Sequence, residues 1–238
     1  MDSKIFQYKD HCGEVLDLTP GKVVCVGRNY AEHAKELGNL VPKTPLLFIK
    51  PKTAIVNLEP EFKIPSTNEL CHFETEIAVL IGKQLTSSIR TSRPNSEIEI
   101  KNAIAGYGIA LDLTFRELQN KLKAKGHPWE IAKSFDGACP VGAFYTGPLK
   151  SNEPGLECLV NNEVRQRGFA VEMVVGIVEL IKLIARHFTL EPGDVVLTGT
   201  PAGVGPLIHG DRLQFKLLNK NNHGIVSELV KYNSLVGT

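Results

Sequence analysis

The sequence predicts an α+β fold in which strands outnumber helices. Most apolar segments of the 238-residue chain are short and rich in β-branched residues, which favours strands. These segments also lack the regular alternation with helices that is typical of doubly wound folds. With 42% hydrophobic residues, the chain can bury a substantial core. We therefore expect one domain over residues 22–238, preceded by a short lead or hairpin over residues 1–21.

The first predicted elements are a strand, a helix and a second strand. Residues 21–27 form an apolar run that ends at a glycine, which predicts a buried strand. Good helix formers follow over residues 29–38, with Asn29 as a capping residue at the start and Gly38 at the end. Prolines surround the apolar residues 46–49, so we expect a strand between extended loops there.

A central strand and a strand-to-helix unit are predicted next. Residues 73–81 are rich in β-branched side chains and end at a glycine, which predicts a central strand. Residues 103–113 form a further apolar strand. Thr114 and Glu117 directly after it match a capping box, in which each side chain bonds to the backbone of the other residue. A helix is therefore expected to about residue 125.

The last part of the chain adds the longest helix and several strands. Apolar residues recur at helical spacing over residues 172–188, which predicts this helix. The other predicted elements are strands over residues 140–146, 156–164 (with a turn at Asn161 and Asn162), 195–198 (after a turn at 191–194) and 211–217, of which the last is the final strand.

Charge and composition exclude several classes of partner. Lys and Arg number 27 against 26 Asp and Glu, and a net charge of +1 gives no global field that attracts nucleic acid or an anionic membrane. No apolar segment approaches the roughly 20 residues of a membrane-spanning helix. The five cysteines have neither the short paired spacing of a zinc site nor the even number of a closed disulfide set. We therefore expect a cytoplasmic protein without nucleic-acid or membrane partners.

Acidic residues at two strand ends are candidates for a metal site. Glu74 and Glu76 are two apart in the predicted central strand, so both carboxylates face the same side. A divalent cation such as Mg²⁺, Mn²⁺ or Ca²⁺ would relieve their repulsion, because hard oxygen ligands suit these ions. The alternative is that both acids simply meet solvent. Asp112 follows another strand, where it either offers a third carboxylate or caps the next helix.

Other side chains have the chemistry of proton transfer or anion binding. His33 and Glu36 are three apart on the first predicted helix. The carboxylate can there hold the imidazole as a general base, unless the two form an ordinary surface pair. Lys133 and Lys50 each adjoin an apolar segment. A lysine in such a place binds a carboxylate, stabilises an enolate or only extends its charge to solvent.

Nucleotide binding is not expected from the glycine-containing segments. The segment 198–205 could cradle an anionic group with backbone N–H groups and the Thr200 hydroxyl, but it lacks the lysine of a P-loop. The strand over residues 23–27 begins like a dinucleotide site, yet the further glycines of that motif are missing.

The chain resembles the fumarylacetoacetate hydrolase family in six segments that follow one another in unbroken order. These segments are residues 24–33, 45–51, 72–77, 106–119, 129–135 and 197–205. The likeness is strongest to the small acylpyruvase and oxaloacetate decarboxylase members. It implies a catalytic domain over residues 22–238 with a mixed β-sheet roll or barrel, a homodimer, and one Mg²⁺ or Mn²⁺ per subunit.

The resemblance also implies roles for individual residues. By motif, the metal ligands would be Glu74, Glu76 and Asp112. His33 and Glu36 would form a dyad on a helix that closes over the substrate, and Lys133 would be the active-site lysine. The positions that touch the substrate or order the site would be Lys50, Gln119 and Thr200, with Arg28 and Arg116 as further candidates for substrate binding.

The expected substrate is a small 2-oxo or 2,4-dioxo acid. The resemblance implies hydrolysis of the C3–C4 bond of an acylpyruvate, or decarboxylation of oxaloacetate, through a metal-stabilised pyruvate enolate. In hydrolysis, His33 would activate water and Lys133 would help to hold the enolate. The alternatives are an isomerase of a 2-hydroxy-diene-dioate, a tautomerase of oxaloacetate and, from another class, a non-catalytic protein that binds a metal or a 2-oxo acid.

Overall fold

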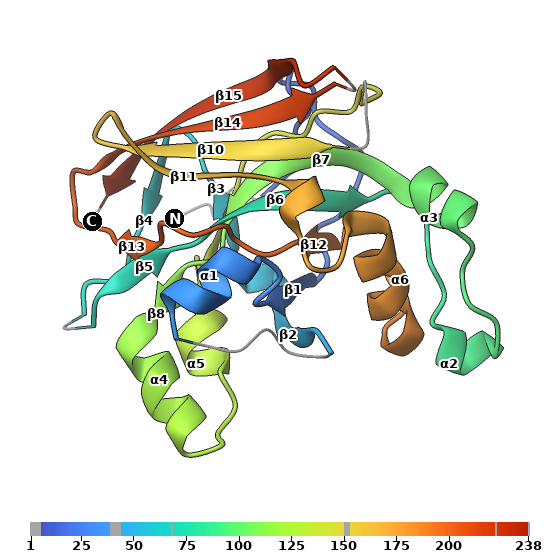
Figure 1. Ribbon diagram of the computed structural model, residues 1–238, viewed down its shortest axis with the longest axis horizontal. Helices are drawn as coiled ribbons and strands as arrows, with labels where there is room; N and C mark the ends of the chain where they lie inside the picture. Colours follow the sequence, from blue (N-terminus) through green and yellow to red (C-terminus); the bar gives the residue numbers. More distant parts are fainter. Residues whose placement is uncertain (1–5, 39–43, 68, 150–152, 222, 238) are drawn as a thin grey trace.

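Among the described residues, strands outnumber helices and lie in three sheets (Figure 1). The computed structural model describes residues 6–38, 44–67, 69–149, 153–221 and 223–237. Within these residues, the largest sheet has seven strands in the order β2 (Leu46–Lys50), β1 (Val23–Gly27), β12 (Val195–Leu197), β6 (Thr75–Ile81), β7 (Ile104–Leu111), β9 (Cys139–Val141) and β3 (Ile55–Asn57). The prediction of a strand-rich α+β fold is confirmed.

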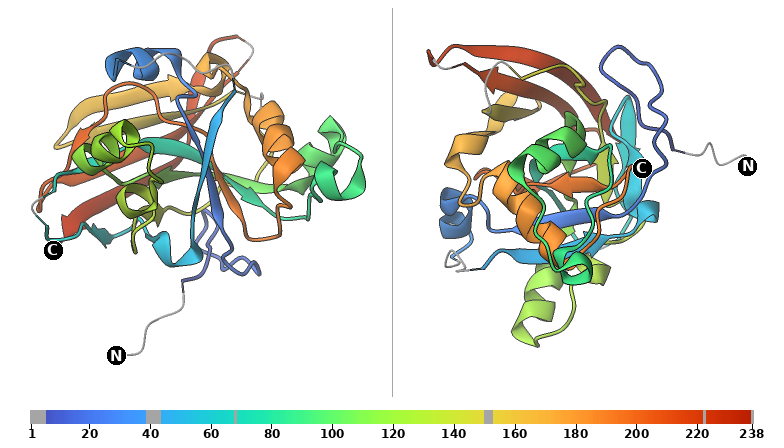
Figure 2. Two further views of the ribbon diagram at one scale, coloured as in Figure 1. Left: turned by 90° about the horizontal axis from the view of Figure 1, so that it is seen from below. Right: turned by 90° about the vertical axis from the view of Figure 1, so that its right-hand side faces the viewer.

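Two further sheets complete the strand layers. The described part of the second has five strands in the order β11 (Glu163–Phe169), β10 (Pro154–Val160), β14 (Arg212–Lys220), β15 (Val226–Gly237) and β4 (Glu61–Lys63). It curls over the largest sheet, with β10 packed on β6 (Figure 2). The small sheet contains β13 (Gly205–Pro206), β5 (Cys71–Phe73) and β8 (Thr114–Phe115).

Five of the six described helices gather in two groups at the edges of these sheets. The described helices are α1 (Ala31–Glu36), α2 (Ser88–Thr91), α3 (Glu97–Ala103), α4 (Arg116–Ala124), α5 (Glu130–Lys133) and α6 (Ile177–His187), with short 3-10 turns at Lys52–Ala54 and Ala170–Glu172. Helices α2, α3 and α6 pack together, whereas α4 and α5 pack on each other and on β8 (Figure 1). Within the described residues, no helix is long and apolar enough to cross a membrane.

Strand β6 is the predicted central strand, and both of its faces are buried. Ile77 and Val79 belong to one hydrophobic cluster, whereas Ala78 and Leu80 belong to another. Because alternate residues of a strand face opposite sides, the side that carries Ala78 and Leu80 also carries Glu76. The chain thus holds an acidic residue on a strand that is covered by apolar side chains on both sides.

Both predicted helix caps are wrong. Helix α1 begins after Tyr30, because the Asn29 side chain instead bonds to residues distant in sequence: its amide donates to the Val175 and Thr198 carbonyls, each at 2.9 Å. Helix α4 begins after Phe115 without a side-chain cap. Thr114 lies in β8 and donates its hydroxyl to the Asp112 carbonyl at 3.0 Å. Tertiary contacts have therefore replaced the capping bond at Asn29, whereas Thr114 bonds to a residue only two positions before it.

The structure also corrects two predictions in the last part of the chain. Helix α6 begins at Ile177 and not at residue 172. The side-chain oxygen of Asn29 accepts the backbone N–H of Val175, and its backbone carbonyl accepts that of Val174. These two bonds hold the segment outside the helix. Residues 211–217 are not the final strand. Strand β15 follows β14 and pairs with it in antiparallel fashion, and with β4 in parallel fashion.

Candidate active site

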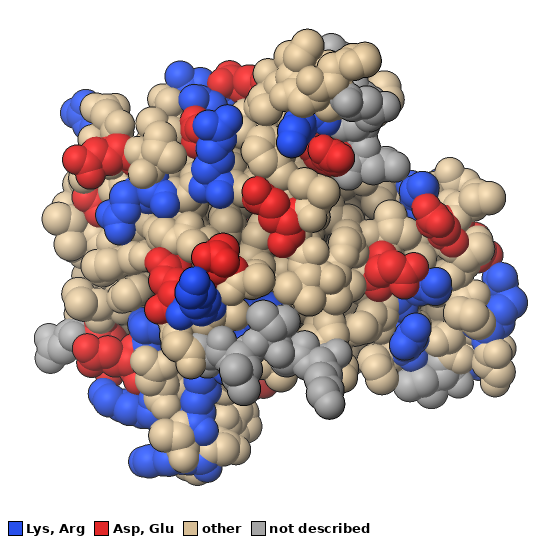
Figure 3. Space-filling model, in the orientation of Figure 1, with Lys and Arg blue, Asp and Glu red and all other residues tan. Residues whose placement is uncertain are grey.

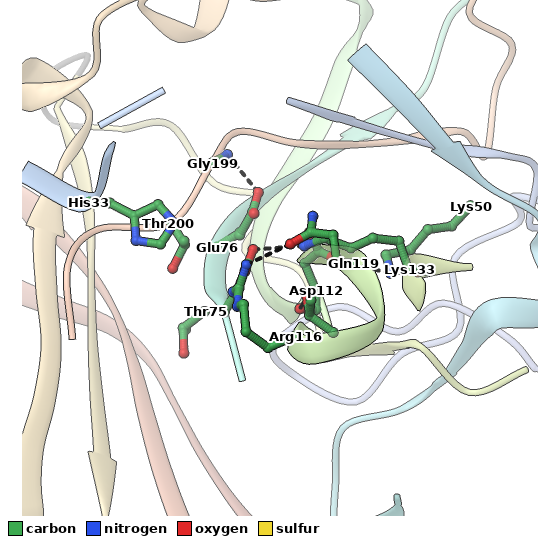
Figure 4. A network of polar contacts seen from close by, with 12 residues as sticks. His33, Lys50, Thr75, Glu76, Asp112, Arg116, Gln119, Lys133, Gly199 and Thr200 are labelled. Carbon is green, nitrogen blue, oxygen red and sulfur yellow. Dashed lines mark hydrogen bonds and ion pairs between the residues drawn. The ribbon is translucent and has the colours of Figure 1, made fainter. Parts of the chain in front are cut away.

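Three acidic residues meet where β6 and β7 pair. Glu76 lies in β6, Glu74 precedes this strand and Asp112 follows β7. The register places Thr75 opposite Leu111, and the Asp112 amide donates to the Glu74 carbonyl at 2.9 Å. One oxygen from each of the three carboxylates lies within 4.8 Å of the others, and each of the three residues is at most 5% exposed. The structure thus brings the predicted ligand set together, and Figure 4 shows Glu76 and Asp112 of this set.

Glu76 is buried without a cationic partner among the described residues. The Gly199 amide donates a hydrogen bond to its Oε2 at 2.5 Å. Burial raises the pKa of the Glu76 carboxyl well above its usual range, and the negative charges of Asp112 and Glu74 raise it further. This carboxylate would therefore be stabilised by a nearby cation.

Glu74 is held as a carboxylate by two cationic side chains. Its Oε2 lies 2.9 Å from the Lys133 Nζ, and its Oε1 pairs with the Arg116 guanidinium. Burial alone would raise the pKa of the Glu74 carboxyl, but Lys133 and Arg116 outweigh burial and lower it. Lys133 also lies 2.6 Å from Asp112, and these two carboxylates raise its pKa against the effect of burial. Lys133 therefore bridges two of the three acids.

Lys50 supports this cluster from outside the pocket. It ends β2 and is fully buried. Its Nζ lies 2.8 Å from the Asp112 Oδ1 and donates to the Lys133 carbonyl. Lys50 does not belong to the lining of the pocket. Its contacts are thus those of a residue that orders the site, and not of one that faces a substrate.

A pocket opens at the acidic cluster and includes most of the predicted site residues. His33 and Thr200 lie to one side of Glu76 in the view of Figure 4, whereas Gln119 and Lys133 lie to the other. All of these residues line the pocket, as do Arg28 and Arg116. Its apolar walls come from Leu46, Phe48 and Trp129. The pocket therefore combines acids, cations, one imidazole and an apolar wall.

His33 is held by its neighbour on helix α1. Its Nδ1 lies 3.1 Å from the Glu36 Oε2, and the residue is only 5% exposed. The other carboxylate oxygen of Glu36 accepts the Gly203 amide at 3.0 Å. Because Nδ1 is engaged, Nε2 is the nitrogen through which His33 can exchange a proton in the pocket.

Hydrogen bonds fix the remaining polar side chains of the pocket. The Arg116 Nη1 donates to the Gln119 Oε1 at 2.8 Å, one turn further along α4. The side-chain Nε2 of Gln166 donates to the Thr200 hydroxyl at 2.7 Å, and the side-chain Oε1 of Gln166 accepts the backbone N–H of Thr75 at 2.9 Å. Gln166 therefore links Thr200 to the strand that carries Glu76.

Two segments near the pocket contain a residue with a positive φ, a backbone conformation that residues with a side chain rarely adopt. Arg28 directly follows β1 with a φ of 63°, and such conformations in non-glycine residues are concentrated at functional sites. Gly203 has a φ of 101°, and a Cβ added there would lie 1.8 Å from the Arg165 carbonyl oxygen. Only glycine fits at this position, which keeps its amide available to Glu36.

Known proteins match this chain over nearly its whole length. The model of the fumarylacetoacetate hydrolase C-terminal family matches residues 22–230. The chain belongs to this family. It is 48% identical over 212 residues to "Oxaloacetate tautomerase YcgM" of Escherichia coli, which covers 88% of this chain and 94% of that protein. It is 43% identical over 204 residues to "Oxaloacetate tautomerase fahd-1, mitochondrial" of Caenorhabditis elegans, with coverages of 84% and 92%.

A solved structure of the family is similar in fold over the whole chain. It is the fumarylpyruvate hydrolase from Pseudomonas aeruginosa in complex with Mn²⁺ and pyruvate, with a TM-score of 0.83 and 30% sequence identity. The match covers 100% of this chain and 97% of that one. The resemblance to the family that the sequence motifs indicated is thereby confirmed.

The acidic cluster fits the divalent metal that this family implies. Its donors are carboxylate oxygens, which suit Mg²⁺ and Mn²⁺. Glu76 contributes a buried oxygen that no cationic side chain of the described residues neutralises, and its two acidic neighbours repel it. Glu74, Glu76 and Asp112 are therefore the residues that would hold such an ion.

Sequence reasoning assigned no role to several residues that belong to the site. Lys123 lines the pocket, and its ammonium lies 5.3 Å from the centroid of the Trp129 ring. A signal for Lys123 was present, because Arg116, Gln119 and Lys123 are spaced at i, i+3 and i+7 and so share one face of α4. Gln166 carried no such signal, since only the tertiary fold brings β11 to Thr200.

Proposed function

We propose that this protein is a divalent-metal-dependent oxaloacetate tautomerase, which interconverts the enol and keto forms of oxaloacetate. The observation that carries the proposal is that one pocket holds both the acidic cluster and an oriented imidazole, His33. Tautomerisation needs a site for the 2-oxygen and 1-carboxylate and a group that moves a proton at C3. Both curated relatives described above are named for this reaction.

The chain's own residues account for the required proton transfer. In ketonisation, the hydroxyl at C2 loses its proton to solvent, the O–H electron pair completes the carbonyl at C2, and the C2=C3 electron pair forms the new C3–H bond. His33 delivers the proton to C3 through Nε2 and regains one from solvent, while Glu36 orients the ring. A divalent cation held by the acidic cluster would supply Lewis acidity toward the oxygen at C2.

Lys133 and Arg116 add positive charge where the reaction develops negative charge. Both are buried and paired with Glu74. A preorganised ammonium next to the acidic cluster stabilises charge on the C2 oxygen without reorganisation of water. Phe48 and Trp129 form an apolar wall of the same pocket.

The proposal is tested by the rate of ketonisation of freshly dissolved enol oxaloacetate. The loss of enol absorbance is followed with Mg²⁺, with Mn²⁺ and with excess chelator. We expect the protein to accelerate it in a metal-dependent manner, and His33→Asn to lower kcat by about 10²-fold or more. A rate no higher than that of the metal ion alone would contradict the proposal.

Hydrolysis of a 2,4-dioxo acid is the second candidate function, and it was among the leading expectations from sequence. Its support is the fold similarity to a fumarylpyruvate hydrolase that binds Mn²⁺ and pyruvate. The His33–Glu36 pair has the chemistry to activate water as well as to move a proton. Decarboxylation of oxaloacetate passes through the same pyruvate enolate.

Pyruvate release separates these candidates from tautomerisation. It is measured with acetylpyruvate and with oxaloacetate, each with Mn²⁺ and with chelator. Release from acetylpyruvate at a kcat/KM above that of ketonisation would make the protein a hydrolase. Pyruvate release from oxaloacetate at a kcat/KM above that of ketonisation would make the protein a decarboxylase. We expect both rates to be well below that of ketonisation.

A further inference from the structure

Lys123 is a pocket cation without an acidic partner. It lies on α4, lines the pocket and is half-buried, and its ammonium is over the Trp129 ring at 5.3 Å from the centroid. Among the described residues, no carboxylate lies within ion-pair distance of it. Arg116 and Lys133, by contrast, are both paired with Glu74. Lys123 is therefore a donor that the fold leaves available.

The surroundings of Lys123 favour an anion. Burial and, after it, the positive charges of Arg116, Arg28 and Lys133 lower the pKa of its ammonium to about 8, while the charge of Glu74 opposes them. A bound anion would relieve this repulsion. Lys and Arg side chains also cluster on the molecular surface around α4, at the lower left of Figure 3, which attracts anions toward this end of the molecule.

The position of Lys123 on the helix separates it from the acidic cluster. It shares a face of α4 with Arg116 and Gln119 but lies seven residues beyond Arg116, about 10 Å along the axis. Arg116 is 9% exposed, whereas Lys123 is partly open to solvent. The geometry therefore places Lys123 nearer the opening of the pocket, with Arg116 nearer the acids.

We propose that Lys123 binds the carboxylate of the substrate that lies farther from the acidic cluster, and that it makes the pocket selective for 2-oxo dicarboxylates over 2-oxo monocarboxylates. This inference rests on the proposed function, because it assigns one end of the same substrate to each end of the pocket. The head of the substrate meets the acidic cluster and Lys133. The ammonium of Lys123 pairs with the carboxylate at C4, where it makes a charge-assisted hydrogen bond.

Kinetics with a matched pair of substrates tests the assignment. The 4-methyl ester of enol oxaloacetate keeps the reacting carbons but lacks the second negative charge. For Lys123→Met, we expect KM for oxaloacetate to rise about tenfold or more, with KM for the ester and both kcat values nearly unchanged. The methionine keeps the unbranched stem against Trp129. Equal changes for acid and ester would overturn the proposal.

Lys121 provides a control on the same helix. Its ammonium is exposed and lies 3.5 Å from Glu69 on a different face of α4. Lys121→Met should leave the preference for the dicarboxylate intact, and Lys123→Arg should largely retain it. If Lys121→Met lowered the preference for the dicarboxylate as much as Lys123→Met, the preference would come from the general electrostatic field of the cations. A direct contact between Lys123 and the carboxylate would then be contradicted.

The pH dependence gives a readout that packing alone would not move. Deprotonation of Lys123 above about pH 8 removes the charge that attracts the second carboxylate. In the wild type, the ratio of KM for oxaloacetate to KM for the ester should therefore rise as the pH increases from 7 to 9. In Lys123→Met this ratio should not change with pH. A rise that persists in the variant would contradict the assignment.

Equilibrium binding keeps this inference separate from the proposed reaction. Malate and lactate are stable 2-hydroxy acids that differ by one carboxylate. With Mn²⁺ present, calorimetry should show the wild type binding malate about tenfold or more tightly than lactate, and Lys123→Met should lose the difference. If ketonisation fails but this preference is found, the proposed function is wrong while the role of Lys123 stands. A wild type that binds both equally would overturn it.

Discussion

Glu36 uses its two carboxylate oxygens for two different contacts. One oxygen holds His33, and the other accepts the amide of Gly203 in the loop after β12. The same side chain therefore orients the imidazole and ties α1 to the loop that carries Thr200. An amide in its place would keep the shape and could still accept from Gly203, but it would lose the charge that supports a protonated imidazole.

Substitution of Glu36 should therefore impair proton transfer more than binding. For Glu36→Gln, we expect kcat for ketonisation to fall by about tenfold or more, because general acid–base catalysis depends on an oriented imidazole, while KM changes little. Steady-state kinetics checks this. Glu32→Gln, on the exposed part of the same helix, is the control and should be close to wild type. A change in KM alone would show that Glu36 serves binding.

Glu76 allows a separate test of the metal assignment. In Glu76→Gln, the amide oxygen can still accept from Gly199, but one of three neighbouring negative charges is gone. We expect calorimetry to show Mn²⁺ affinity lowered by at least about tenfold. In chelator, the midpoint of thermal unfolding should be equal to or above that of the wild type, because like-charge repulsion is relieved. Unchanged Mn²⁺ affinity would show that Glu76 is not a metal ligand. Glu163→Gln, at an exposed position of β11, is the control and should leave Mn²⁺ affinity unchanged.

Among the elements, those with strong local patterns were predictable from sequence. Strand β6 follows from its β-branched composition, and its alternation correctly placed Glu74 and Glu76 together. Helix α4 lies where it was expected, but the capping box from which it was predicted is not formed. The cap at Asn29 was wrong because its side chain bonds to residues that only the fold brings near, and the cap at Thr114 was wrong because its hydroxyl bonds back to the Asp112 carbonyl, two residues earlier. Periodicity shows which face a residue occupies but does not identify its tertiary partner.

Strand β15 was missed because apolar and polar residues do not alternate regularly along it. Val226 and Leu235 are exposed, whereas the adjacent residues Leu229 and Val230 both pack against the core. Tyr232 is fully buried, and its hydroxyl donates to the Ala143 carbonyl at 2.7 Å. A Cβ at Gly142 would lie 2.6 Å from its ring. This one side chain thus fastens β15 to the largest sheet.

Tyr232 should therefore contribute strongly to stability. We expect Tyr232→Ala to lower the free energy of unfolding by about 3–5 kcal/mol, as is typical of large buried aromatic residues. Tyr232→Phe removes only the hydrogen bond and should cost about 1 kcal/mol. Urea denaturation measures both. Lys231→Ala at the exposed neighbouring position should remain within about 0.5 kcal/mol of the wild type. A similar small loss for Tyr232→Ala would mean that β15 docks by other contacts.

In the whole molecule, the three sheets meet at the acidic cluster. Glu74 lies between β5 of the small sheet and β6 of the largest, and the Thr75 amide donates to Gln166 of the curled sheet. The site is therefore built by the junction of the sheets and not by one loop. Strand alternation could therefore predict that Glu74 and Glu76 share a face, whereas supporting residues such as Gln166, which only this junction brings near, could not be predicted.

The charges at this junction are formally balanced when all three acids are ionised. Three carboxylates, those of Glu74, Glu76 and Asp112, are then matched by three cations, which are Lys50, Arg116 and Lys133. A divalent cation would favour the ionised form of Glu76, whose pKa is raised by burial and by its acidic neighbours, and would leave the cluster with two positive charges in excess. A dianionic ligand bound with it would restore neutrality. Unbalanced charge is costly in a buried place. The divalent cation and the dianionic ligand should therefore each favour the binding of the other.

Positive coupling between metal and dianion is thus expected. Oxalate, a small mimic of the pyruvate enolate, should bind Mn²⁺-loaded protein at least about tenfold more tightly than protein in chelator, within the range usual for coupled sites. Calorimetric titration of oxalate with and without Mn²⁺ measures this, after correction for oxalate–Mn²⁺ association in buffer. In Glu76→Gln, weaker metal binding should remove most of the increase in oxalate affinity that Mn²⁺ causes. Oxalate that bound equally well without metal would show that Lys133 and Arg116 alone attract the anion, and that the charge balance does not link the two ligands.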